Sequence, residues 1–287
     1  MSARIVVVGL GPGDPGLVTA ATLGAIDRMA HRYVRTTRHP SAPLVAGAVS
    51  FDHHYEAEAT FDDVYRRIAE DLVAAAKVHG EVLYAVPGSP MVLERSVEHL
   101  LSIAADPATG VEVEVLAATS FLDLVWVRLG VDPFGDGVRL VDAHRFAERA
   151  AGERGPLLVA HCHNQRVLSD IKLAVTDFPP VPVTVLQRLG TEDEAVFTVA
   201  WEDLDRSFEP DHLTAVWIPE LATPVAAELQ ALVGLVSTLR ERCPWDREQT
   251  HHSLTRHLLE ETYEVLEALG ALPPGADGSH DAYPHVE

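Results

Sequence analysis

The chain has 287 residues and a formal net charge of −21 at pH 7. This charge argues against a nucleic-acid partner, because binding to phosphates needs clustered Lys and Arg. The length allows one large or two ordinary domains, and a 47% hydrophobic content is enough for substantial cores. Two cysteines, Cys162 and Cys243, are too few for a disulfide framework. No apolar run approaches the roughly twenty residues of a membrane span. The N-terminus enters a predicted strand directly, which leaves no room for a signal peptide. We therefore expect a soluble cytoplasmic protein with no membrane partner.

A glycine- and proline-rich turn near the N-terminus is the first feature of note. Residues 5–8 predict a strand and residues 17–30 predict a helix, with Gly9-Leu10-Gly11-Pro12-Gly13-Asp14-Pro15-Gly16 between them. Glycines permit positive φ and close approach, and a strand–turn–helix unit presents backbone N–H groups to a ligand. Pro12, Asp14 and Pro15 do not fit the dinucleotide fingerprint G-x-G-x-x-G. The pattern alone fits a ligand loop and a plain structural turn equally well.

Strands and helices then alternate, which predicts βαβ units and a largely parallel sheet. In the first 117 residues we expect strands at 32–34, 82–86 and 111–116, helices at 65–77 and 91–103, and a loop at 35–48. Glutamates at alternate positions of 111–116 indicate a sheet margin. A second lobe is expected from about Ala118, with strands at 138–141, 156–161, 183–186 and 213–218 and a helix through Leu168 and Ile171.

The last part of the chain differs in kind. Residues 219–224 contain two prolines and predict a linker. Helices are expected at 226–239 and 253–269, separated by a break at Cys243-Pro244-Trp245-Asp246. A loop rich in Pro, Gly and Asp is expected at 273–285. We therefore divide the chain into an α/β domain at 1–222, with lobes at about 1–117 and 118–222, and an all-α segment at 223–287.

The glycine-rich turn resembles the first motif of the tetrapyrrole (corrin/porphyrin) methylase family. Further matches follow in family order at residues 86–90, 118–123 and 129–133, so the resemblance covers about residues 5–220. It implies two α/β lobes with S-adenosylmethionine folded into the cleft between them. It also implies backbone-dominated cofactor contacts by Gly11, Pro12, Gly13, Asp14, Pro87, Gly88, Ser89, Val92, Ser120 and Phe121. Ser89 replaces the aspartate of the family's Gly-Gly-Asp-Pro, and no residue identifies a tetrapyrrole as the methyl acceptor.

Three carboxylates, those of Glu260, Glu261 and Glu264, fall on one face of the predicted last helix. The apolar residues of this helix fall on the opposite face. Carboxylates gathered in one patch suit Mg²⁺ with retained waters and substrate phosphates. A solvated acidic helix face explains the same pattern, because such clusters are common on amphipathic helices.

The stretch 239–269 resembles the start of a MazG-type nucleoside triphosphate pyrophosphohydrolase domain. The resemblance implies that Glu260, Glu261 and Glu264 are catalytic Mg²⁺ ligands and that Trp245, Asp246 and Gln249 contact or frame the nucleotide. Metal-activated water would then convert an NTP or dNTP to a nucleoside monophosphate and pyrophosphate. The family completes its metal site with a later Glu-x-x-Asp, and none follows Glu264. We therefore expect a segment truncated before its second acidic motif, with poor or no hydrolysis by this chain alone.

The primary prediction is thus a MazG-family pyrophosphohydrolase fused to an S-adenosylmethionine-binding, methylase-like domain. The alternative is an S-adenosylmethionine-dependent methyltransferase, acting on an unidentified small molecule, with a vestigial or oligomerising tail. The exposed apolar face of the tail predicts a homo-oligomer. The histidines of His161-Cys162-His163, His53-His54 and His251-His252 are interpreted as structural or surface residues, because a compact metal site wants three or four ligands.

Overall fold

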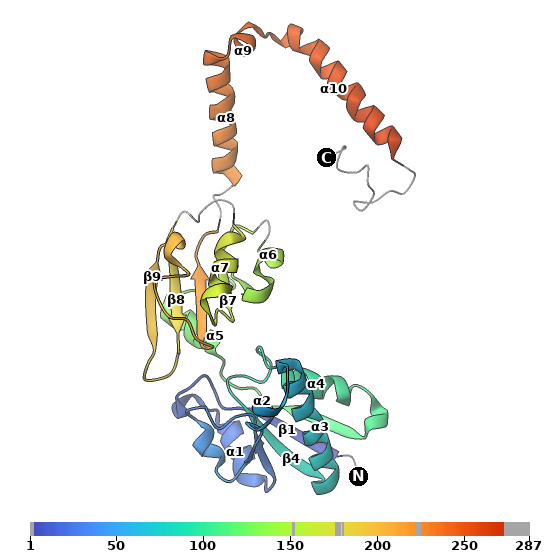
Figure 1. The fold of residues 1–287 in the computed structure, drawn as a ribbon, viewed down its shortest axis with the longest axis vertical. Coiled ribbons are helices and arrows are strands. Elements are labelled where there is room, and N and C mark those ends of the chain that lie inside the picture. The colour runs from blue at the N-terminus through green and yellow to red at the C-terminus, as the bar shows by residue number, and fades with distance from the viewer. Residues whose placement is uncertain (1–2, 151–152, 176–178, 180, 222–224, 273–287) are drawn as a thin grey trace. The chain divides into compact units, whose positions relative to one another are not determined.

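The computed structural model describes residues 3–150, 153–175, 179, 181–221 and 225–272, with side chains in the first helix of the tail from residue 232 onward. The chain divides into two compact units, Met1–Ala222 and Thr223–Glu287 (Figure 1). The first unit contains two five-stranded sheets, and the second contains helices in its described part. The loop expected at 273–285 lies outside the described residues.

The first sheet is fully parallel, as the alternation of elements predicts. Its strands are β1 Ala3–Gly9, β2 Arg32–Val34, β3 Val49–Ser50, β4 Glu81–Val86 and β5 Val111–Val115, in the order β3-β2-β4-β1-β5. The glutamate-bearing strand β5 lies at an edge of the sheet, as expected. Gly9 pairs with Val86 in the register of β1 and β4, so the loops that follow these two strands leave the sheet side by side.

Both faces of this sheet are covered because its strands alternate apolar side chains between the two faces. Ile5 and Val7 pack with helices α3 (Phe61–His79) and α4 (Arg95–Ala104) on one face. Val6 and Val8 pack with α1 (Ala20–Arg28) on the other. The one-turn helix α2 (His54–Ala57) follows β3 and contacts α3.

Two helices of this lobe begin later than the periodicity predicts. The helix expected from residue 17 begins at Ala20, because Asp14 caps a 3-10 turn at Pro15–Leu17 and the Thr19 side chain then caps α1. The helix expected from residue 91 begins at Arg95, because Leu93 has a φ of +57° and Glu94 is the N-cap residue of α4. Conversely, α3 begins four residues earlier than expected, where the Thr60 side chain accepts a hydrogen bond from the Asp63 N–H.

The second sheet is mixed, whereas the alternation of strands and helices predicted a largely parallel one. Its strands are β6 Arg139–Asp142, β7 Leu157–Ala160, β8 Val183–Gln187, β9 Ala195–Val199 and β10 Thr214–Ile218, in the order β6-β7-β10-β8-β9. Only β6 and β7 are parallel; β10 pairs antiparallel with β7 and β8, and β9 forms a hairpin with β8 that the sequence analysis missed. A parallel sheet needs a crossover between strands, and the short 188–194 connection permits only a hairpin.

Helices cover this sheet on both faces as well. Helices α6 (Phe146–Arg149) and α7 (Gln165–Leu173) pack with Val159 and Val216, and Trp201 is fully enclosed in the same core. Helix α5 (Phe121–Leu129) packs on the opposite face with Leu158 and Trp217. The remaining 3-10 turns of the first unit are Ala42–Val45, Pro107–Thr109, Ala143–Arg145 and Trp201–Asp203.

The second unit contains α8 (Val225–Arg242), α9 (Pro244–Glu248) and α10 (His251–Ala271). The break before α9 falls where Pro244 was expected to cause it, and the Thr250 side chain caps α10 by accepting from the Ser253 N–H. Large apolar side chains of these helices are exposed, including Leu258 at 68% and Tyr263 at 69%. No helix in the described part of the chain is long and apolar enough to span a bilayer.

Candidate functional site

The two glycine-containing loops after β1 and β4 are joined directly. The Gly11 N–H donates to the Gly88 carbonyl at 3.2 Å, and the Gly88 N–H donates to the Gly11 carbonyl at 2.8 Å. Both residues have positive φ, +69° and +66°, which a residue with a side chain adopts only with strain. This bridge lies beyond the carboxyl ends of neighbouring parallel strands, where open α/β sheets bind their ligands.

The predicted motif at residues 118–123 also approaches this bridge. A Cβ atom on Gly9 would lie 2.3 Å from the Gly88 carbonyl oxygen, 2.5 Å from Ala118 Cβ and 2.8 Å from Pro90 Cδ. The close approach of these three segments therefore requires glycine at position 9. In contrast, a Cβ on Gly88 would meet no heavy atom within 4 Å. The Gly88 side of the bridge is thus a backbone surface that a ligand can approach without obstruction from a side chain.

The glycine loop also contacts the loop after β8. A Cβ on Gly13 would lie 2.4 Å from the Gly190 carbonyl oxygen, and one on Gly190 would lie 3.6 Å from Pro12 Cγ. On its other side, the Ser41 hydroxyl donates to the Gly13 carbonyl at 2.7 Å. Residues 11–13 are therefore held by a neighbour on each side, which fixes the loop before any ligand arrives.

The remaining predicted cofactor residues have more local roles. Asp14 is exposed, and its carboxylate accepts from the Gly16 N–H at 2.7 Å. Ser120 is the N-cap of α5 and forms a capping box with Asp123. Among the residues predicted to contact the cofactor, the half-buried ones are Pro12, Pro87, Ser89, Val92 and Phe121. The structure thus brings Gly11, Gly13 and Gly88 together, whereas Asp14 caps the 3-10 turn at Pro15–Leu17.

A buried ion pair beside this bridge was not found from the sequence. Glu94 is 3% exposed, and its carboxylate accepts from Arg35 Nη1 at 2.8 Å and from the Ser96 hydroxyl at 2.6 Å. Burial raises the pKa of the Glu94 carboxyl, while the Arg35 guanidinium and Ser96 oppose the rise. Tyr84 extends the network through a 2.8 Å hydrogen bond to Ser96. Because Arg35 follows β2 at the carboxyl edge of the sheet, its position was the signal available for this site.

His39 links this network to the glycine loop. Its Nδ1 accepts from the Ser41 N–H at 3.2 Å, and the ring also hydrogen-bonds the backbone of Gly11. Burial and the nearby Arg35 charge lower the pKa of His39 to about 4. His39 is therefore neutral at pH 7, with its second nitrogen available as a donor to the Gly11 carbonyl.

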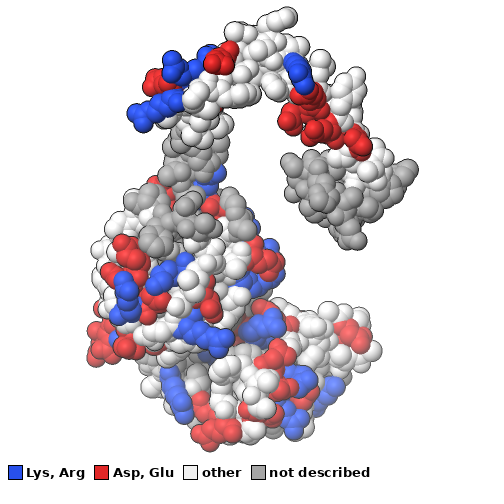
Figure 2. All heavy atoms as spheres, turned by 45° about the horizontal axis from the view of Figure 1, so that its top comes forward, with Lys and Arg blue, Asp and Glu red and all other residues white. Residues whose placement is uncertain are grey.

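The predicted nucleotide residues lie in the second unit, where Glu260, Glu261 and Glu264 are exposed on α10. Acidic side chains form a run along this helix (Figure 2). Arg256 donates to Glu260 at 2.8 Å and lowers the pKa of its carboxyl. Gln249 donates to the Trp245 carbonyl at 3.1 Å, while Asp246 lies in α9 with its own carbonyl bound by Arg240.

A compact metal-ligand group occurs elsewhere in the described part of the chain. The three glutamates of α10 are not among the groups of three or more ligands that lie within 4.8 Å of one another; His53, His54 and Asp71 are the one such group among described residues. His161 instead pairs with Asp142 at 2.9 Å, and His163 bonds the His161 carbonyl. Cys162 is buried, and burial raises the pKa of its thiol. This agrees with the structural interpretation of the His161 cluster.

The first unit thus consists of two α/β lobes, and the first lobe carries the Gly11–Gly88 bridge at the carboxyl ends of its strands, which is the architecture of a methylase-type fold. The model of the family Tetrapyrrole (Corrin/Porphyrin) Methylases matches residues 4–205, and the chain belongs to this family. Uroporphyrin-III C-methyl transferase from Thermus thermophilus, solved with S-adenyl homocysteine, is 21% identical with a TM-score of 0.58 over 75% of this chain and 97% of that one. Diphthine synthase is 17% identical with a TM-score of 0.56 over 75% of this chain and 90% of that one.

The curated relatives add a second similarity. The uncharacterized protein YabN of Bacillus subtilis is 33% identical over 279 residues, which is 94% of this chain and 56% of that protein. The chain therefore spans little more than half the length of this relative. The nucleoside triphosphate pyrophosphohydrolase of Mycobacterium tuberculosis is 57% identical over 37 residues, which is 13% of this chain and 11% of that protein.

Proposed function

We propose that the first unit is an S-adenosylmethionine-dependent methyltransferase. The observation that carries this proposal is the Gly11–Gly88 backbone bridge, whose Gly88 side would leave any Cβ in open space. A cofactor can approach the backbone closely at this point, because glycine places no side chain between them. Membership of the methylase family and the bound S-adenyl homocysteine of the Thermus thermophilus enzyme support it.

The cofactor, when bound, supplies a methyl group activated by a positively charged sulfur. The residues of this chain that would hold it are Gly11, Pro12, Gly13, Pro87, Gly88 and Ser89, with Ser120 and Phe121 at the start of α5. Because Gly9 and Ala118 pack against the bridge, these segments keep their geometry without a ligand. Such preorganisation lowers the entropy lost on binding and aligns the donor with the acceptor.

We assign the acceptor end of the site to the network of Arg35, His39 and Glu94. Arg35 Nε is buried without a hydrogen-bond partner among the described residues. An unpaired buried donor is costly, and an oxygen of the acceptor would satisfy it. Glu94 fixes the guanidinium, while neutral His39 holds the glycine loop. Uroporphyrin-III C-methyl transferase and diphthine synthase are named for different molecules, so the chemistry of Arg35 is what defines the acceptor as an oxygen-bearing molecule.

Isothermal titration of the 287-residue chain with S-adenosylhomocysteine tests this function, with NAD⁺ as a control for nonspecific binding of adenine compounds. Saturable binding of S-adenosylhomocysteine, and none of NAD⁺ at the same concentrations, is the expected result. Absence of S-adenosylhomocysteine binding by a folded chain would remove the basis of the proposal.

We also propose, as a second candidate, that the second unit belongs to a Mg²⁺-dependent nucleoside triphosphate pyrophosphohydrolase of MazG type. Support comes from the acidic face of α10 and from the 57% identity over 37 residues with the Mycobacterium tuberculosis enzyme. The test is pyrophosphate release from mixed NTPs and dNTPs with Mg²⁺. Release that the double variant Glu260→Ala/Glu264→Ala abolishes, and that the matched surface variant Glu248→Ala retains, would establish the activity; no release would leave methyl transfer as the working function.

Association through the tail accompanies this second candidate. Leu232, Leu258, Leu259 and Leu266 are each more than half exposed, and exposed apolar patches usually mark interfaces. We propose that a second copy of the chain covers them. Light scattering across a concentration series tests this: a dimer that Leu258→Glu/Leu259→Glu dissociates is expected, and a wild-type monomer at all concentrations would contradict it.

A further inference from the structure

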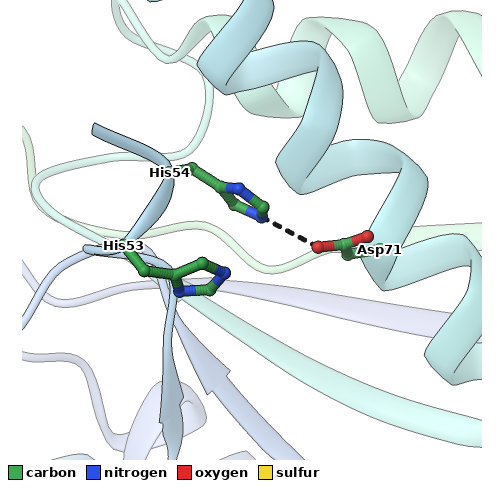
Figure 3. A group of neighbouring side chains, drawn as sticks. All are labelled: His53, His54 and Asp71. Atoms are coloured by element: carbon green, nitrogen blue, oxygen red, sulfur yellow. Dashed lines mark hydrogen bonds and ion pairs between the residues drawn. The ribbon is translucent and has the colours of Figure 1, made fainter. Parts of the chain in front are cut away.

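A compact group of metal-ligating side chains lies apart from the glycine bridge. His53 and His54 are consecutive residues at the start of α2, and Asp71 lies in the middle of α3. Their ligand atoms all lie within 4.8 Å of one another. Both imidazole rings extend toward the Asp71 carboxylate from the same side (Figure 3). Elements that are separate in sequence thus direct three donor groups to one point.

We propose that His53, His54 and Asp71 form a binding site for a divalent late first-row metal ion such as Zn²⁺. Two imidazole nitrogens and one carboxylate oxygen are a ligand set that suits Zn²⁺ and related ions and disfavours Mg²⁺ and Ca²⁺, which prefer oxygen. This site is distinct from the carboxylates of α10 and does not depend on the methyltransferase proposal.

The two histidines differ in a way that suits such a site. His54 is buried, stacks on Phe51 with ring centroids 5.8 Å apart, and bonds Asp71 through Nε2 at 2.8 Å. This hydrogen bond fixes the ring and the carboxylate in place. His53 is exposed, yet its ring lies 4.1 Å from that of His54, centroid to centroid. The His54–Asp71 bond fixes two of the three ligands, and packing near Phe51, with ring centroids 6.4 Å apart, keeps the His53 ring close to both.

Only small adjustments separate this arrangement from a coordinated one. Ligand atoms at about 2.0–2.1 Å from a tetrahedral Zn²⁺ lie about 3.3 Å from one another. The 2.8 Å contact must open slightly, and His53 must close on the other two by side-chain rotation alone, because it is exposed. Binding releases the Nε2 proton of His54 or moves it to Nδ1, and each nitrogen then donates a lone pair to the ion. Water completes the fourth position on the exposed side.

The experiment uses the untagged full chain and Zn²⁺ in competition with a chromophoric chelator, under reducing conditions. The wild type is expected to bind one more equivalent of Zn²⁺ than either His53→Ala or Asp71→Asn, or to bind it at least tenfold more tightly. These variants alter exposed or half-exposed side chains, so the fold is retained. His54→Ala is not used, because it removes a buried ring. His79→Ala is the matched control, because His31 and His79 form an exposed stacked pair with centroids 3.8 Å apart and belong to no group of three ligands among the described residues.

A second measurement separates binding from folding. Zn²⁺ is expected to raise the thermal unfolding temperature of the wild type and of His79→Ala, and to leave that of His53→Ala unchanged. Substitution with Co²⁺ should give visible absorption bands that His53→Ala and Asp71→Asn lack. Equal Zn²⁺ stoichiometry and affinity for the wild type and His53→Ala, with both folded, would overturn the proposal.

Discussion

Gly11 and Gly88 exchange two backbone hydrogen bonds, of 3.2 and 2.8 Å, across the ends of the neighbouring strands β1 and β4. Through this bridge the first methylase motif and the Pro87-Gly88 turn hold each other in place. Gly9 packs beneath them against Ala118, which begins the second lobe. Three motifs that are far apart in sequence therefore meet in one backbone cluster.

Replacement of Gly9 by alanine should destabilise the first unit by about 3 kcal/mol, because the new Cβ would overlap backbone and side-chain atoms that cannot move apart. The nearest atom would be the Gly88 carbonyl oxygen at 2.3 Å. Gly24→Ala is the matched control. It lies in α1, where a Cβ meets only the flexible end of Arg28 at 3.3 Å, so a stabilisation of about 1 kcal/mol is expected. Urea unfolding measures the change in unfolding free energy of each variant. Equal changes for Gly9→Ala and Gly24→Ala would contradict the packing described for Gly9.

Replacement of Glu94 by glutamine should cost about 3 kcal/mol of unfolding free energy, because it leaves the Arg35 guanidinium largely buried without its counter-charge. Glu98→Gln provides the comparison. Glu98 pairs with Arg95 on the exposed surface of α4, so its loss should cost no more than about 0.5 kcal/mol. Chemical denaturation at pH 7 measures the difference. Two losses of similar size would show that Glu94 carries no buried charge interaction.

Stability should fall with decreasing pH because of His39. Its pKa is about 4 in the folded chain and about 6.5 when unfolded. Between these values the unfolded state takes up a proton that the native state does not, so the unfolding free energy falls by up to about 3 kcal/mol as pH drops from 7 to 4. His39→Gln removes this term, and the difference between wild type and variant isolates it from other titrating groups. Parallel pH profiles would contradict the neutral, buried state of His39.

The sequence predicted β1 and β4 because each is a largely apolar run that ends at a glycine or just before a proline. It missed the starts of α1 and α4, because Asp14, Thr19 and Glu94 cap or interrupt these helices locally, and side-chain caps compete with the apolar periodicity. It also missed β9, whose residues Ala195–Val199 pair only through the hairpin with β8. Pairing partners of this kind are set by tertiary structure.

The candidate site was predictable where it depends on backbone and was missed where it depends on side chains. Gly11 and Gly88 were found because glycine and proline spacing is visible in the chain. Arg35 and Glu94 are separated by 59 positions, and nothing in either neighbourhood indicates their pairing. His53 and His54 were interpreted as structural or surface residues. His53 is exposed, but His54 is buried, because α2 packs on α3 and brings its ring to Asp71.

The measurement that tests the account most directly is S-adenosylhomocysteine binding to Gly88→Asn and Gly110→Asn. Both glycines have a φ of +66°, and a Cβ at either position would meet no heavy atom within 4 Å. Asparagine tolerates positive φ better than most residues with a side chain, so the comparison between the two variants tests what their side chains face.

Gly110→Asn is expected to bind S-adenosylhomocysteine like the wild type. Gly88→Asn should lose at least tenfold in affinity at an unchanged unfolding temperature, because its side chain would occupy the space assigned to the cofactor. Equal binding by both variants would contradict the assignment of the Gly11–Gly88 bridge as the cofactor surface.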